Sequence, residues 1–549
     1  MTAADQAPAR RIDLTRIVKA YDVRGEAGVD FTIEAARALG AAFADHLDSA
    51  EIIVAHDMRV SSPELSGAFA DGAVRRGATV AFAGLSSTDQ LYCASGLHRA
   101  AGAMFTASHN PAPDNGIKMC TAGARPISRD TGLSEIRDRA QRYLDAGEIP
   151  EVPGGRRESI DTLGDYVATV LDLVPVPARR PLRVVVDAAN AMAGHTMPAV
   201  AERLEGIEVI PMHFELDGTF PNHEANPLDF STLAQVRERV VVEGADLGLA
   251  FDGDADRCVV IDERGEVVSP SAVTALIAVR EIARARAAGE ESPSVVANLV
   301  SSRHVAEAIA SSGGTRVRSK VGHSLIKALM AEHGAVFGGE HSAHYYFRDF
   351  FFADSGMLAA LHVLAALEET DGPLSALVAE HDPYVASGEI NSRVEDAQAS
   401  RDAVRAEMER IPGVVIDDLD GMTVTHWDDS APESEHWWFS LRSSNTEPLL
   451  RLNVEAAVPA TMEAIRDQVL AIVRGEAPQA EPLPAAEGPL AVAASGADIP
   501  AWVRDAIRCP VCRGVLEDAE AALICAGCGR SYPVRDGIPL LMPQASDQS

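Results

Sequence analysis

EIIVAHDMRVSSPELSGAFADGAVRRGATVAFAG, residues 51–84, has the composition of a strand, a helix and a second strand in that order. Its β-rich runs begin at 51 and 78, and an Ala-, Leu- and Arg-rich run separates them. The same alternation continues to about residue 370, with β-rich runs from 182, 246 and 293 and helical stretches over 63–76, 231–243, 271–288, 302–312 and 354–368. Such alternation is typical of parallel or mixed sheets covered by helices. The sequence therefore predicts an α/β fold.

The predicted strands are too numerous for one domain. After residue 384 the pattern changes, because strand-like GVVIDD, MTVTHW, WWFSLR and LLRLNVEA precede one helix, which predicts a small α+β domain. A later Pro/Ala/Gly/Glu-rich stretch lacks a periodic apolar face and is expected to be an extended linker. The predicted units are three α/β domains at 12–153, 154–265 and 266–383, an α+β domain at 384–475, a linker at 476–500 and a small module at 501–545.

Composition limits the partners and the compartment. Against 48 Lys and Arg stand 81 Asp and Glu, a formal net charge of −33, which argues against nucleic acid as a partner because phosphate backbones require clustered cations. No stretch approaches the roughly 18 apolar residues of a membrane helix. The N-terminus has charges but lacks the apolar core of a signal peptide. We expect a cytoplasmic protein without membrane association.

The first segment with candidate catalytic residues is TASHNPAPDNGIK, residues 106–118. It follows the apolar run AGAMF, so Ser108 is expected at the C-terminal end of a strand, the edge where ligands bind in open α/β sheets. A hydroxyl, the His109 imidazole and the Asn110 amide stand side by side in a tight Pro- and Gly-containing loop. Lys118 returns a cation to the same place. The alternative is a polar turn with an incidental histidine.

The second segment is FDGDADR, residues 251–257, in which three aspartates alternate. Gly253 is expected to let the backbone turn so that the carboxylates converge. Three hard oxygen donors suit Mg²⁺, and the adjacent Arg257 suits a phosphate. An EF-hand is disfavoured because no glutamate stands at the twelfth loop position. The predicted metal ligands are Asp252, Asp254 and Asp256; the alternative is a solvated acidic turn.

The third segment is GGEHSAHYYF, residues 338–347, which follows KVGHSLIK at 320–327. Glu340, Ser342 and His344 alternate as they would on one face of an extended segment. A carboxylate and a hydroxyl can hold neighbouring sugar hydroxyls, and an imidazole can move a proton. A single histidine is more often structural, so the prediction depends on the grouping.

The fourth segment is LRSSNTEP, residues 441–448, with Arg451 close behind. Arg442 offers a planar donor fork, and the loop adds hydroxyl, amide and backbone donors that could cradle a phosphate. Without the arginine, a Ser/Asn-rich hairpin turn would be the better interpretation.

These segments together resemble the α-D-phosphohexomutase superfamily over about residues 12–475, because all four motifs occur in that family's order. TASHNP, DGDADR, GEHSAH and RSSNTEP are similar to its phosphoserine, metal, sugar-recognition and phosphate-binding loops, and KAYDVRG at 19–25 is similar to its N-terminal motif. The resemblance implies four domains around a deep central cleft, with one motif from each. One departure is Ala343, where the family usually has glycine. An alanine is expected there only if its φ is negative.

The resemblance also implies a reaction. A phosphoryl group on Ser108 passes to a hexose phosphate, giving a hexose 1,6-bisphosphate that serves as intermediate and activator, and the other phosphate then returns to the serine. The implied catalytic residues are Ser108, His109, Lys118, Arg257 and His344, and the implied Mg²⁺ ligands are Ser108, Asp252, Asp254 and Asp256. The implied substrate-binding residues are Tyr21, Arg24, Lys320, His323, Glu340, Ser342, Arg442, Ser444, Asn445, Thr446 and Arg451.

The preferred sugar is less clearly indicated. HYYFRDFFFADSGMLAALHVLAAL, residues 344–367, looks most like bacterial enzymes of the phosphomannomutase type, many of which also accept glucose phosphates. A phosphoglucosamine mutase remains an alternative because DGDADR is shared across the subfamilies. Two further alternatives are a hydrolase in which water attacks the phosphoserine and a scaffold that acts through the C-terminal tail.

That tail is CPVCRGVLEDAEAALICAGCGRSYPVRDGIPLLMP, residues 509–543, with two CxxC pairs. Four thiolates can surround one tetrahedral Zn²⁺, which favours a metal site in a reducing compartment over a disulfide framework. The predicted ligands are Cys509, Cys512, Cys525 and Cys528. The segment resembles the Trm112-like zinc-ribbon family, which implies a structural zinc and an interaction with a protein partner. Nothing in it looks catalytic.

Overall fold

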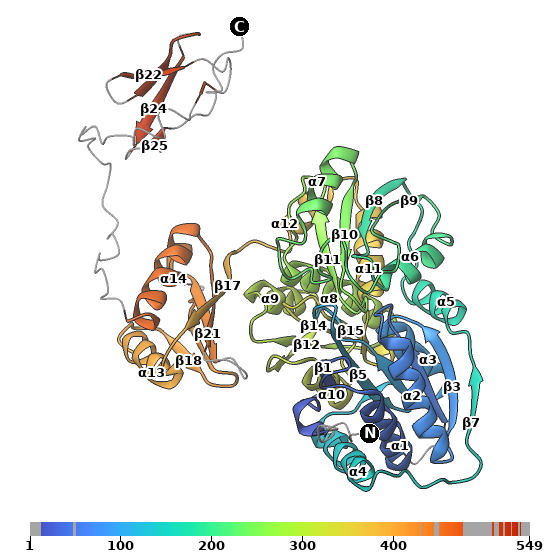
Figure 1. The fold of residues 1–549 in the computed structure, drawn as a ribbon. Helices are drawn as coiled ribbons and strands as arrows, with labels where there is room; N and C mark the ends of the chain where they lie inside the picture. The colour runs from blue at the N-terminus through green and yellow to red at the C-terminus, as the bar shows by residue number, and fades with distance from the viewer. Residues whose placement is uncertain are drawn as a thin grey trace, which may run out of the picture. The chain divides into compact units, whose positions relative to one another are not determined.

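The computed structural model describes residues 12–47, 51–428, 430–443, 449–475, 508–509, 515–519, 522–528, 530–535 and 538–539. The chain divides into two compact units, residues 1–478 and residues 479–549. The first unit contains four sheets, which follow one another along the chain from blue to orange in Figure 1. Among the described helices, none is both long and apolar enough to cross a lipid bilayer.

The first sheet is mixed and has the strand order β1-β5-β4-β2-β3-β7, with β6 paired to β5. Its strands are β1 (Val23–Glu26), β2 (Glu51–His56), β3 (Thr79–Leu85), β4 (Ala101–Phe105), β5 (Asp114–Thr121), β6 (Arg125–Pro126) and β7 (Arg156–Ser159). Its helices are α1 (Ile33–His46), α2 (Ser62–Arg75), α3 (Thr88–His98) and α4 (Leu133–Ala146). Helices α1 and α2 pack closely, since a Cβ on Gly40 would lie 2.0 Å from the Phe69 carbonyl oxygen.

The second sheet has the order β11-β10-β8-β9, in which β10, β8 and β9 are parallel and β11 is antiparallel to β10. Its strands are β8 (Leu182–Asp187), β9 (Ile207–Met212), β10 (Leu247–Phe251) and β11 (Cys258–Asp262), and its helices are α5 (Leu163–Leu173), α6 (Ala193–Ala201) and α7 (Ala234–Glu243). The parallel strands bring their C-terminal ends to one edge, which is where ligands gather in such sheets.

The third sheet has the order β13-β12-β14-β15-β16. Its strands are β12 (Ser294–Asn298), β13 (Thr315–Ser319), β14 (Phe337–Gly339), β15 (Tyr345–Phe347) and β16 (Ala353–Asp354), and its helices are α8 (Pro270–Ala287), α9 (Arg303–Ser311), α10 (His323–His333), α11 (Gly356–Glu368) and α12 (Leu374–Ala379). Helix α11 reads GMLAALHVLAALE and is buried along its whole length, as expected of a helix that is apolar on every side. It joins the second and third sheets in one continuous apolar core.

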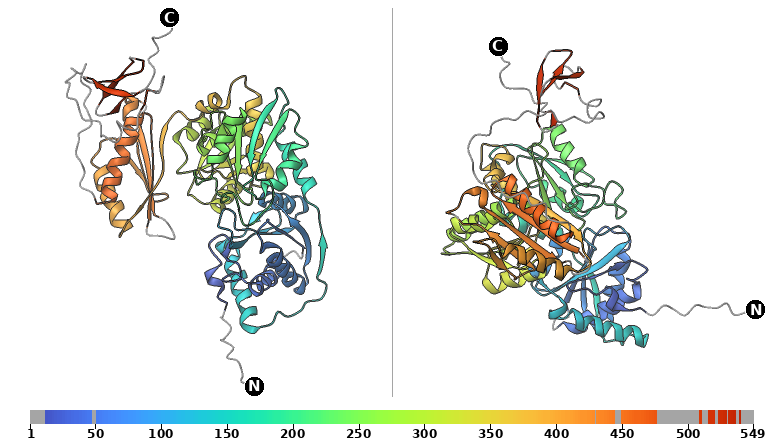
Figure 2. Two further views of the ribbon diagram at one scale, coloured as in Figure 1. Left: turned by 45° about the horizontal axis from the view of Figure 1, so that its top comes forward. Right: turned by 90° about the vertical axis from the view of Figure 1, so that its left-hand side faces the viewer.

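The fourth sheet is antiparallel throughout, in the order β17-β21-β20-β19-β18. Its strands are β17 (Val385–Arg393), β18 (Val415–Asp417), β19 (Met422–His426), β20 (Trp437–Ser443) and β21 (Leu449–Ala456), and its helices are α13 (Ala397–Met408) and α14 (Pro459–Val473). Both helices lie on one face of the sheet (Figures 1 and 2). Three α/β domains and an α+β domain are therefore present, which confirms the predicted fold class.

The second unit is a small antiparallel sheet with the order β22-β23-β24-β25. Its strands are β22 (Leu516–Ala519), β23 (Ala522–Cys525), β24 (Ser531–Arg535) and β25 (Ile538–Pro539). A small apolar cluster that includes Leu516, Leu523 and Tyr532 lies beside two of the cysteines. Such a core is too small to stabilise a fold without a bound metal ion or another cross-link.

Candidate active site

Ser108 lies in the loop after β4, at the C-terminal end of that strand as predicted. Its φ is 51°, a left-handed conformation that is uncommon for residues other than glycine. The backbone N–H of Ser108 donates to Thr106 Oγ1 at 2.9 Å, and the Ser108 hydroxyl donates to Asp252 Oδ2 at 2.9 Å. The side chain is buried. A strained, buried serine held against a carboxylate is typical of a functional position.

Arg59 holds this loop in place. Its guanidinium is fully buried, pairs with Asp57 at 3.2 Å and donates to carbonyl oxygens of the loop. The four carbonyls are those of Ser108 at 2.8 Å, Asn110 at 2.7 Å, Pro111 at 2.8 Å and Asp114 at 3.0 Å. One buried side chain thereby fixes four main-chain carbonyls of an irregular loop.

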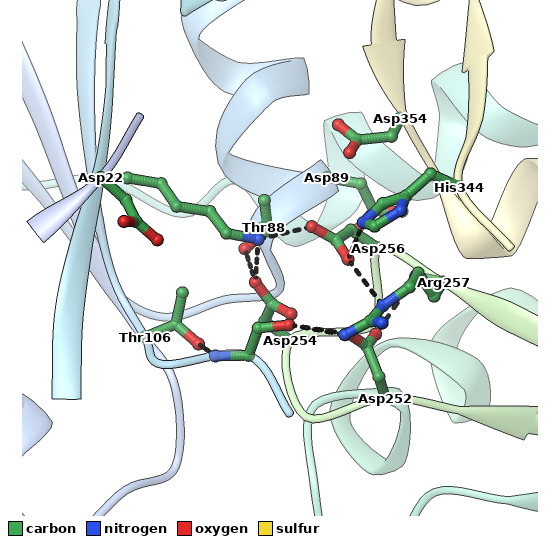
Figure 3. Close-up of polar contacts among 12 residues, drawn as sticks. Asp22, Thr88, Asp89, Thr106, Asp252, Asp254, Asp256, Arg257, His344 and Asp354 are labelled. Atoms are coloured by element: carbon green, nitrogen blue, oxygen red, sulfur yellow. Dashed lines mark hydrogen bonds and ion pairs between the residues drawn. The ribbon is translucent and has the colours of Figure 1, made fainter. Parts of the chain in front are cut away.

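The carboxylates of Asp252, Asp254 and Asp256 come together in the loop after β10 (Figure 3). One oxygen of each lies within 4.8 Å of the others, and all three side chains are buried. Two of the oxygens, Asp254 Oδ1 and Asp256 Oδ1, accept no hydrogen bond from any described residue. Buried, unsatisfied carboxylate oxygens in a cluster of hard donors fit a divalent cation such as Mg²⁺.

The backbone turns at Gly253 and Asp254, as predicted. The turn is closed by a hydrogen bond from the Ala255 N–H to the Asp252 carbonyl at 3.1 Å, and Ala255 has a φ of 60°. Glycine at position 253 also permits a close approach, because a Cβ there would lie 2.3 Å from the carbonyl oxygen of Ser108. The residue lets the metal loop and the serine loop touch.

Lys118 places its ammonium between two of these aspartates, at 2.6 Å from Asp254 Oδ2 and 2.5 Å from Asp256 Oδ2. Thr88 Oγ1 also donates to Asp254 Oδ2, at 2.5 Å. Burial by itself would lower the pKa of Lys118, but the two carboxylates outweigh it and raise that pKa well above its usual value. Lys118 is therefore a permanent cation in this site.

Arg257 connects the metal loop to the serine. Its Nε donates to Asp252 Oδ2 at 2.9 Å, and its Nη2 donates to Ser108 Oγ at 3.1 Å. Nη2 also contacts His109 Nδ1. Burial, together with Arg257 and Arg24, lowers the pKa of His109 to about 2. A neutral His109 is poorly suited to accept a proton.

Arg24 reaches the same loop from β1. Its Nη1 donates to Asn110 Oδ1 at 2.6 Å and to the Ala107 carbonyl at 3.2 Å. Tyr21 is 37% exposed, and its hydroxyl oxygen lies 4.0 Å from the point that a Cβ on Gly322 would occupy. The N-terminal motif thus lies between the serine loop and the start of α10.

The segment that carries Glu340, Ser342 and His344 is a tight turn between β14 and β15, not the extended segment that was predicted. The turn is closed by a hydrogen bond from the Ala343 N–H to the Glu340 carbonyl at 3.1 Å. Ala343 has a φ of 60°, so the expectation of a negative φ was also wrong. The strain of about 1–2 kcal/mol for a non-glycine residue is held by this turn and by the bridge between Arg257 and His344.

The side chains of Glu340, Ser342 and His344 do not share one face in this turn. Glu340 is buried and accepts from the Tyr346 hydroxyl at 2.7 Å and from the Gly322 N–H at 3.2 Å. His344 points toward the aspartate cluster, with Nε2 3.7 Å from Asp256 Oδ1 (Figure 3). Ser342 Oγ lies 3.1 Å from the other ring nitrogen. The imidazole thus joins the turn between β14 and β15, which is predicted to recognise the sugar, to the predicted metal site.

Arg442 and Arg451 face each other across β20 and β21. Their guanidiniums lie 3.6 Å and 3.0 Å from the Glu389 carboxylate. Burial lowers the pKa of Arg442, against the opposing effect of Asp420 and Glu389. Ser444, Asn445 and Thr446 lie outside the described residues, as does the side chain of His323. Lys320 is exposed just before α10.

Four domain models of one family match the first unit in order. They are the phosphoglucomutase/phosphomannomutase alpha/beta/alpha domains I, II and III at residues 15–146, 164–265 and 270–384, and the C-terminal domain at 389–472. The chain belongs to the phosphoglucomutase/phosphomannomutase family. A Trm112p-like model matches residues 505–537.

Curated relatives cover the same region. A phosphomannomutase of Escherichia coli K12 is 35% identical over 469 residues, covering 83% of this chain and 98% of the relative. A protein of Xanthomonas campestris named phosphohexose mutases is 36% identical over 471 residues, covering 83% and 99%. The crystal structure of a phosphoglucomutase/phosphomannomutase family protein from Burkholderia thailandensis superposes with a TM-score of 0.73 at 30% identity, covering 83% and 97%. The chain is thus an enzyme of this mutase type.

The cysteine-bearing unit carries part of the predicted zinc site. The sulfur atoms of Cys509, Cys525 and Cys528 lie within 4.8 Å of one another, and Tyr532 Oη lies 3.0 Å from Cys509 Sγ. Cys512 lies outside the described residues. The described cluster fits Zn²⁺, which prefers thiolate ligands in structural sites.

Sequence reasoning missed three residues of this mutase site. Thr88 is the first residue of α3, and its hydroxyl contacts Asp254. The hydrogen bonds of Arg59 go to backbone carbonyls, and its ion pair goes to Asp57. No side-chain motif in the sequence therefore indicates its role. Asp354 forms a buried ion pair with Lys327 at 2.6 Å, beside His344. Ser87 just before α3 is a capping signal, but nothing in it identifies a contact between Thr88 and a loop more than 160 residues away.

Proposed function

We propose that this mutase interconverts mannose 6-phosphate and mannose 1-phosphate, and also accepts glucose phosphates, by carrying a phosphoryl group on Ser108. The observation that supports this most directly is the position of the Ser108 hydroxyl. It contacts Asp252 in the three-carboxylate cluster and Arg257 at once. A serine hydroxyl between a predicted cation site and a guanidinium is suited to hold and release a phosphoryl group.

In the first half of the proposed reaction, a hydroxyl of the bound hexose phosphate attacks the phosphorus on Ser108. A bond forms between phosphorus and the sugar oxygen, and the bond between phosphorus and Ser108 Oγ breaks. The sugar hydroxyl loses its proton to the protein, and the product is a hexose 1,6-bisphosphate. In the second half, the other phosphoryl group passes to Ser108, and the released sugar oxygen takes a proton back.

The charges of the site are suited to this transfer. Mg²⁺ bound by Asp252, Asp254, Asp256 and the phosphoserine would neutralise charge on the transferring group. Arg257 already donates to Ser108 Oγ, and Lys118 adds a second fixed cation. Because phosphoryl transfer depends mainly on positioning and electrostatic stabilisation, these groups supply what the reaction requires.

The proton must move through a nearby group. His109 is disfavoured by its low pKa, and Lys118 is held protonated. We therefore assign His344 as the residue that exchanges the proton of the sugar hydroxyl, with Lys118 as a charge donor. Its ring nitrogens lie next to Asp256 and Ser342, between the cluster and the sugar-recognition turn.

The phosphate that is not reacting would be held by Arg442 and Arg451 together with Ser444, Asn445 and Thr446. The two guanidiniums share the Glu389 carboxylate, and Arg442 also lies 3.7 Å from Asp420. Two planar guanidiniums carry more donors than these contacts use, which leaves capacity for a phosphate. Since each phosphate must use this position in turn, Glu340 and Ser342 would recognise hydroxyls presented similarly in both orientations. Tyr21, Arg24, Lys320 and His323 complete the proposed substrate-binding set.

Phosphorus NMR of the full chain with Mg²⁺ and catalytic hexose 1,6-bisphosphate tests this function. Sugar 1-phosphates, sugar 6-phosphates and inorganic phosphate give separate signals, so isomerisation and hydrolysis are measured together. We expect mannose 1-phosphate to convert faster than glucose or glucosamine 1-phosphate. A preference for glucosamine would indicate a phosphoglucosamine mutase, and release of inorganic phosphate as the main product would indicate a hydrolase.

The phosphoserine is tested in the same experiment. Mass spectrometry should find phosphate on the tryptic peptide that spans 100–118, and Ser108→Ala should abolish turnover because no neighbouring group can carry the phosphoryl. Ser66→Ala, which removes another buried hydroxyl of the first domain, should remain active. Full activity of Ser108→Ala would refute the mechanism.

For the rest of the chain we retain the predicted organisation as a proposal, with domains at 12–153, 154–265, 266–383 and 384–475, a linker at 476–500 and a module at 501–545. We propose that Cys512 completes the zinc tetrahedron and that the module binds a protein partner. We place the enzyme in the cytoplasm, where its thiols stay reduced.

A further inference from the structure

A second cluster of metal-binding side chains lies in the second domain. Asp187 ends β8, His213 follows directly after β9, and His223 lies in the long loop before α7. One ligand atom of each residue lies within 4.8 Å of the others. The proposed mutase reaction uses none of these three side chains. Two imidazoles and one carboxylate form a donor set that transition metals favour.

The chain brings the two histidines together by a specific backbone arrangement. His213 has a φ of 52°, and its carbonyl accepts a hydrogen bond from the Asn190 N–H at 2.8 Å. The His213 and His223 rings meet edge to face, with centroids 5.4 Å apart. Both rings are half-buried, while Asp187 is fully buried. The cluster is therefore anchored on its carboxylate side and open to solvent on its imidazole side.

The hydrogen bonds of His223 leave an unfavourable contact. Its Nδ1 lies 2.9 Å from the Glu224 carbonyl oxygen, which can only accept, so Nδ1 carries the hydrogen. A neutral ring then presents the lone pair of Nε2 to Asp187 Oδ2 at 2.9 Å. Two acceptors face each other at that distance. A cation, either a proton or a metal ion, must stand at this contact.

The outer contacts of both histidines resemble those of metal ligands. A metal-bound histidine usually donates its second ring N–H to a carbonyl or another acceptor, which orients the ring. His223 Nδ1 has the Glu224 carbonyl, and His213 Nε2 lies 3.1 Å from Gln235 Oε1. The other carboxylate oxygen, Asp187 Oδ1, is held by the Ala189 N–H at 2.9 Å. Each of the three ligands is thus oriented by a separate group.

From this geometry we propose that Asp187, His213 and His223 bind a divalent transition-metal ion of the Zn²⁺ class, separate from both the Mg²⁺ site and the cysteine site. Three protein ligands leave the fourth tetrahedral position to water. In a tetrahedron with bonds of about 2.0–2.1 Å the ligand atoms are about 3.3 Å apart. His223 Nε2 and Asp187 Oδ2 are 2.9 Å apart, and all three ligand atoms lie within 4.8 Å of one another.

The ion would stabilise a loop that supports the serine. Between the two histidines, a Cβ on Gly218 would lie 2.6 Å from the Arg59 Cα, so the loop touches the first domain there. The Phe220 ring lies under the Arg59 guanidinium at 5.1 Å. Arg59 in turn holds the carbonyl of Ser108. Metal binding would therefore fix the loop that covers the residue supporting the phosphoserine.

The competing explanation is an ion pair. Burial alone would lower the pKa of His223, but the Asp187 carboxylate and the Glu224 carbonyl outweigh burial and raise it. A protonated His223 would satisfy Asp187 without a metal. This explanation does not need His213, whereas the metal site does. A substitution of His213 therefore distinguishes the metal site from the ion pair.

The test is zinc stoichiometry of the full chain in excess Mg²⁺, which keeps the aspartate cluster filled. After chelation and readdition of Zn²⁺, gel-filtered wild-type protein should retain about two zinc ions per chain, one in each zinc site. His213→Asn should retain about one, since asparagine tolerates the left-handed backbone but removes the imidazole. Cys509→Ser should also retain about one. His98→Asn, a surface change in the first domain, should match the wild type.

Cobalt substitution identifies the ion that is lost. Co²⁺ bound by thiolates gives intense charge-transfer absorption, which should persist in His213→Asn and disappear in Cys509→Ser. Wild-type protein that retains zinc only at the cysteine site would overturn the proposal and favour the protonated ion pair. A second zinc ion that survives His213→Asn but disappears in Asp254→Asn would also overturn it, by placing that ion in the aspartate cluster.

Discussion

Replacing Lys118 with methionine tests how its ammonium group affects both Mg²⁺ binding and turnover. In the structure, Lys118 donates to Asp254 and Asp256 at 2.6 Å and 2.5 Å, and its side chain is only 14% exposed. The same carboxylates form the proposed Mg²⁺ site. Methionine keeps most of the side-chain volume and removes the charge. The variant should therefore bind Mg²⁺ more tightly and turn over more slowly.

The magnitudes follow from the contacts. Leaving buried carboxylates without their cation costs about 3–5 kcal/mol, so the metal-free variant should lose stability. For a cooperative unit of about 150–250 residues, a loss near 3 kcal/mol lowers Tm by roughly 6–12 °C. In the wild type, Mg²⁺ must weaken charge-assisted hydrogen bonds worth about 1.5–3 kcal/mol each. Losing one of them corresponds to about a tenfold difference in Kd.

Calorimetric titration and thermal melts with and without Mg²⁺ measure these changes, and the mutase assay measures turnover. We expect a lower Tm without metal, a larger rise of Tm on adding Mg²⁺, and a reduced kcat. Lys327→Met is the matched control, because Lys327 also forms a buried pair, with Asp354 at 2.6 Å. It should lower Tm while leaving the Mg²⁺-dependent rise as in the wild type.

Weaker Mg²⁺ binding by Lys118→Met would refute this reasoning. It would mean that the ammonium supports the site rather than competing with the ion. Unchanged metal-free stability would show that the contacts with Asp254 and Asp256 do not persist in solution.

Four further changes give expected outcomes. Asp254→Asn should weaken Mg²⁺ binding and lower kcat in the mutase assay, because an amide removes charge from a hard-cation site. Arg442→Lys should raise KM about tenfold, because a point charge replaces a bidentate fork and loses a hydrogen bond of about 1.5–3 kcal/mol. Ala343→Gly should stabilise the enzyme by up to about 1 kcal/mol in chemical denaturation, since relieved left-handed strain exceeds the entropy added to the unfolded chain. Deleting 477–549 should leave mutase activity largely intact.

Matched controls accompany these changes. Asp371→Asn and Arg405→Lys are surface substitutions and should leave Mg²⁺ binding and KM unchanged. Ala297→Gly, within β12, should destabilise the protein, since glycine in a strand interior costs about 0.5–1 kcal/mol. Each prediction has an outcome that would contradict it. For Asp254→Asn this is turnover without metal, and for Arg442→Lys it is an unchanged KM. For Ala343→Gly it is a loss of stability, and for the truncated enzyme it is a collapsed kcat.

The strands and helices were predictable because their signals are local. The β-rich run at 51 is β2, and the helical run over 63–76 is α2. In both, the order of apolar and polar residues within the segment itself indicates the type of element. Ser108 was predictable for the same reason: an apolar run followed by a polar loop marks the end of a buried strand. The family resemblance then indicated which loops belong to one site.

The errors arose where distant segments decide a local conformation. Gly253 lies in the predicted turn, but the close carbonyl of Ser108, which excludes a side chain there, was not predicted. Ala343 adopts a left-handed φ, which alanine disfavours in isolation, because the surrounding turn over-determines it. The pKa of His109 is lowered by burial and by two arginines that lie far from it in sequence. A single sequence does not show these neighbours.

Arg59 has a consequence for repeated turnover. In the proposed reaction the serine alternates between a phosphorylated and an unmodified state, and these differ by about two negative charges at neutral pH. The Arg59 guanidinium binds only main-chain oxygens of the loop, which do not change when the hydroxyl is esterified. The loop can therefore keep one conformation through both covalent states. Each catalytic cycle then begins with the nucleophile already in place, and no time is lost in rebuilding it.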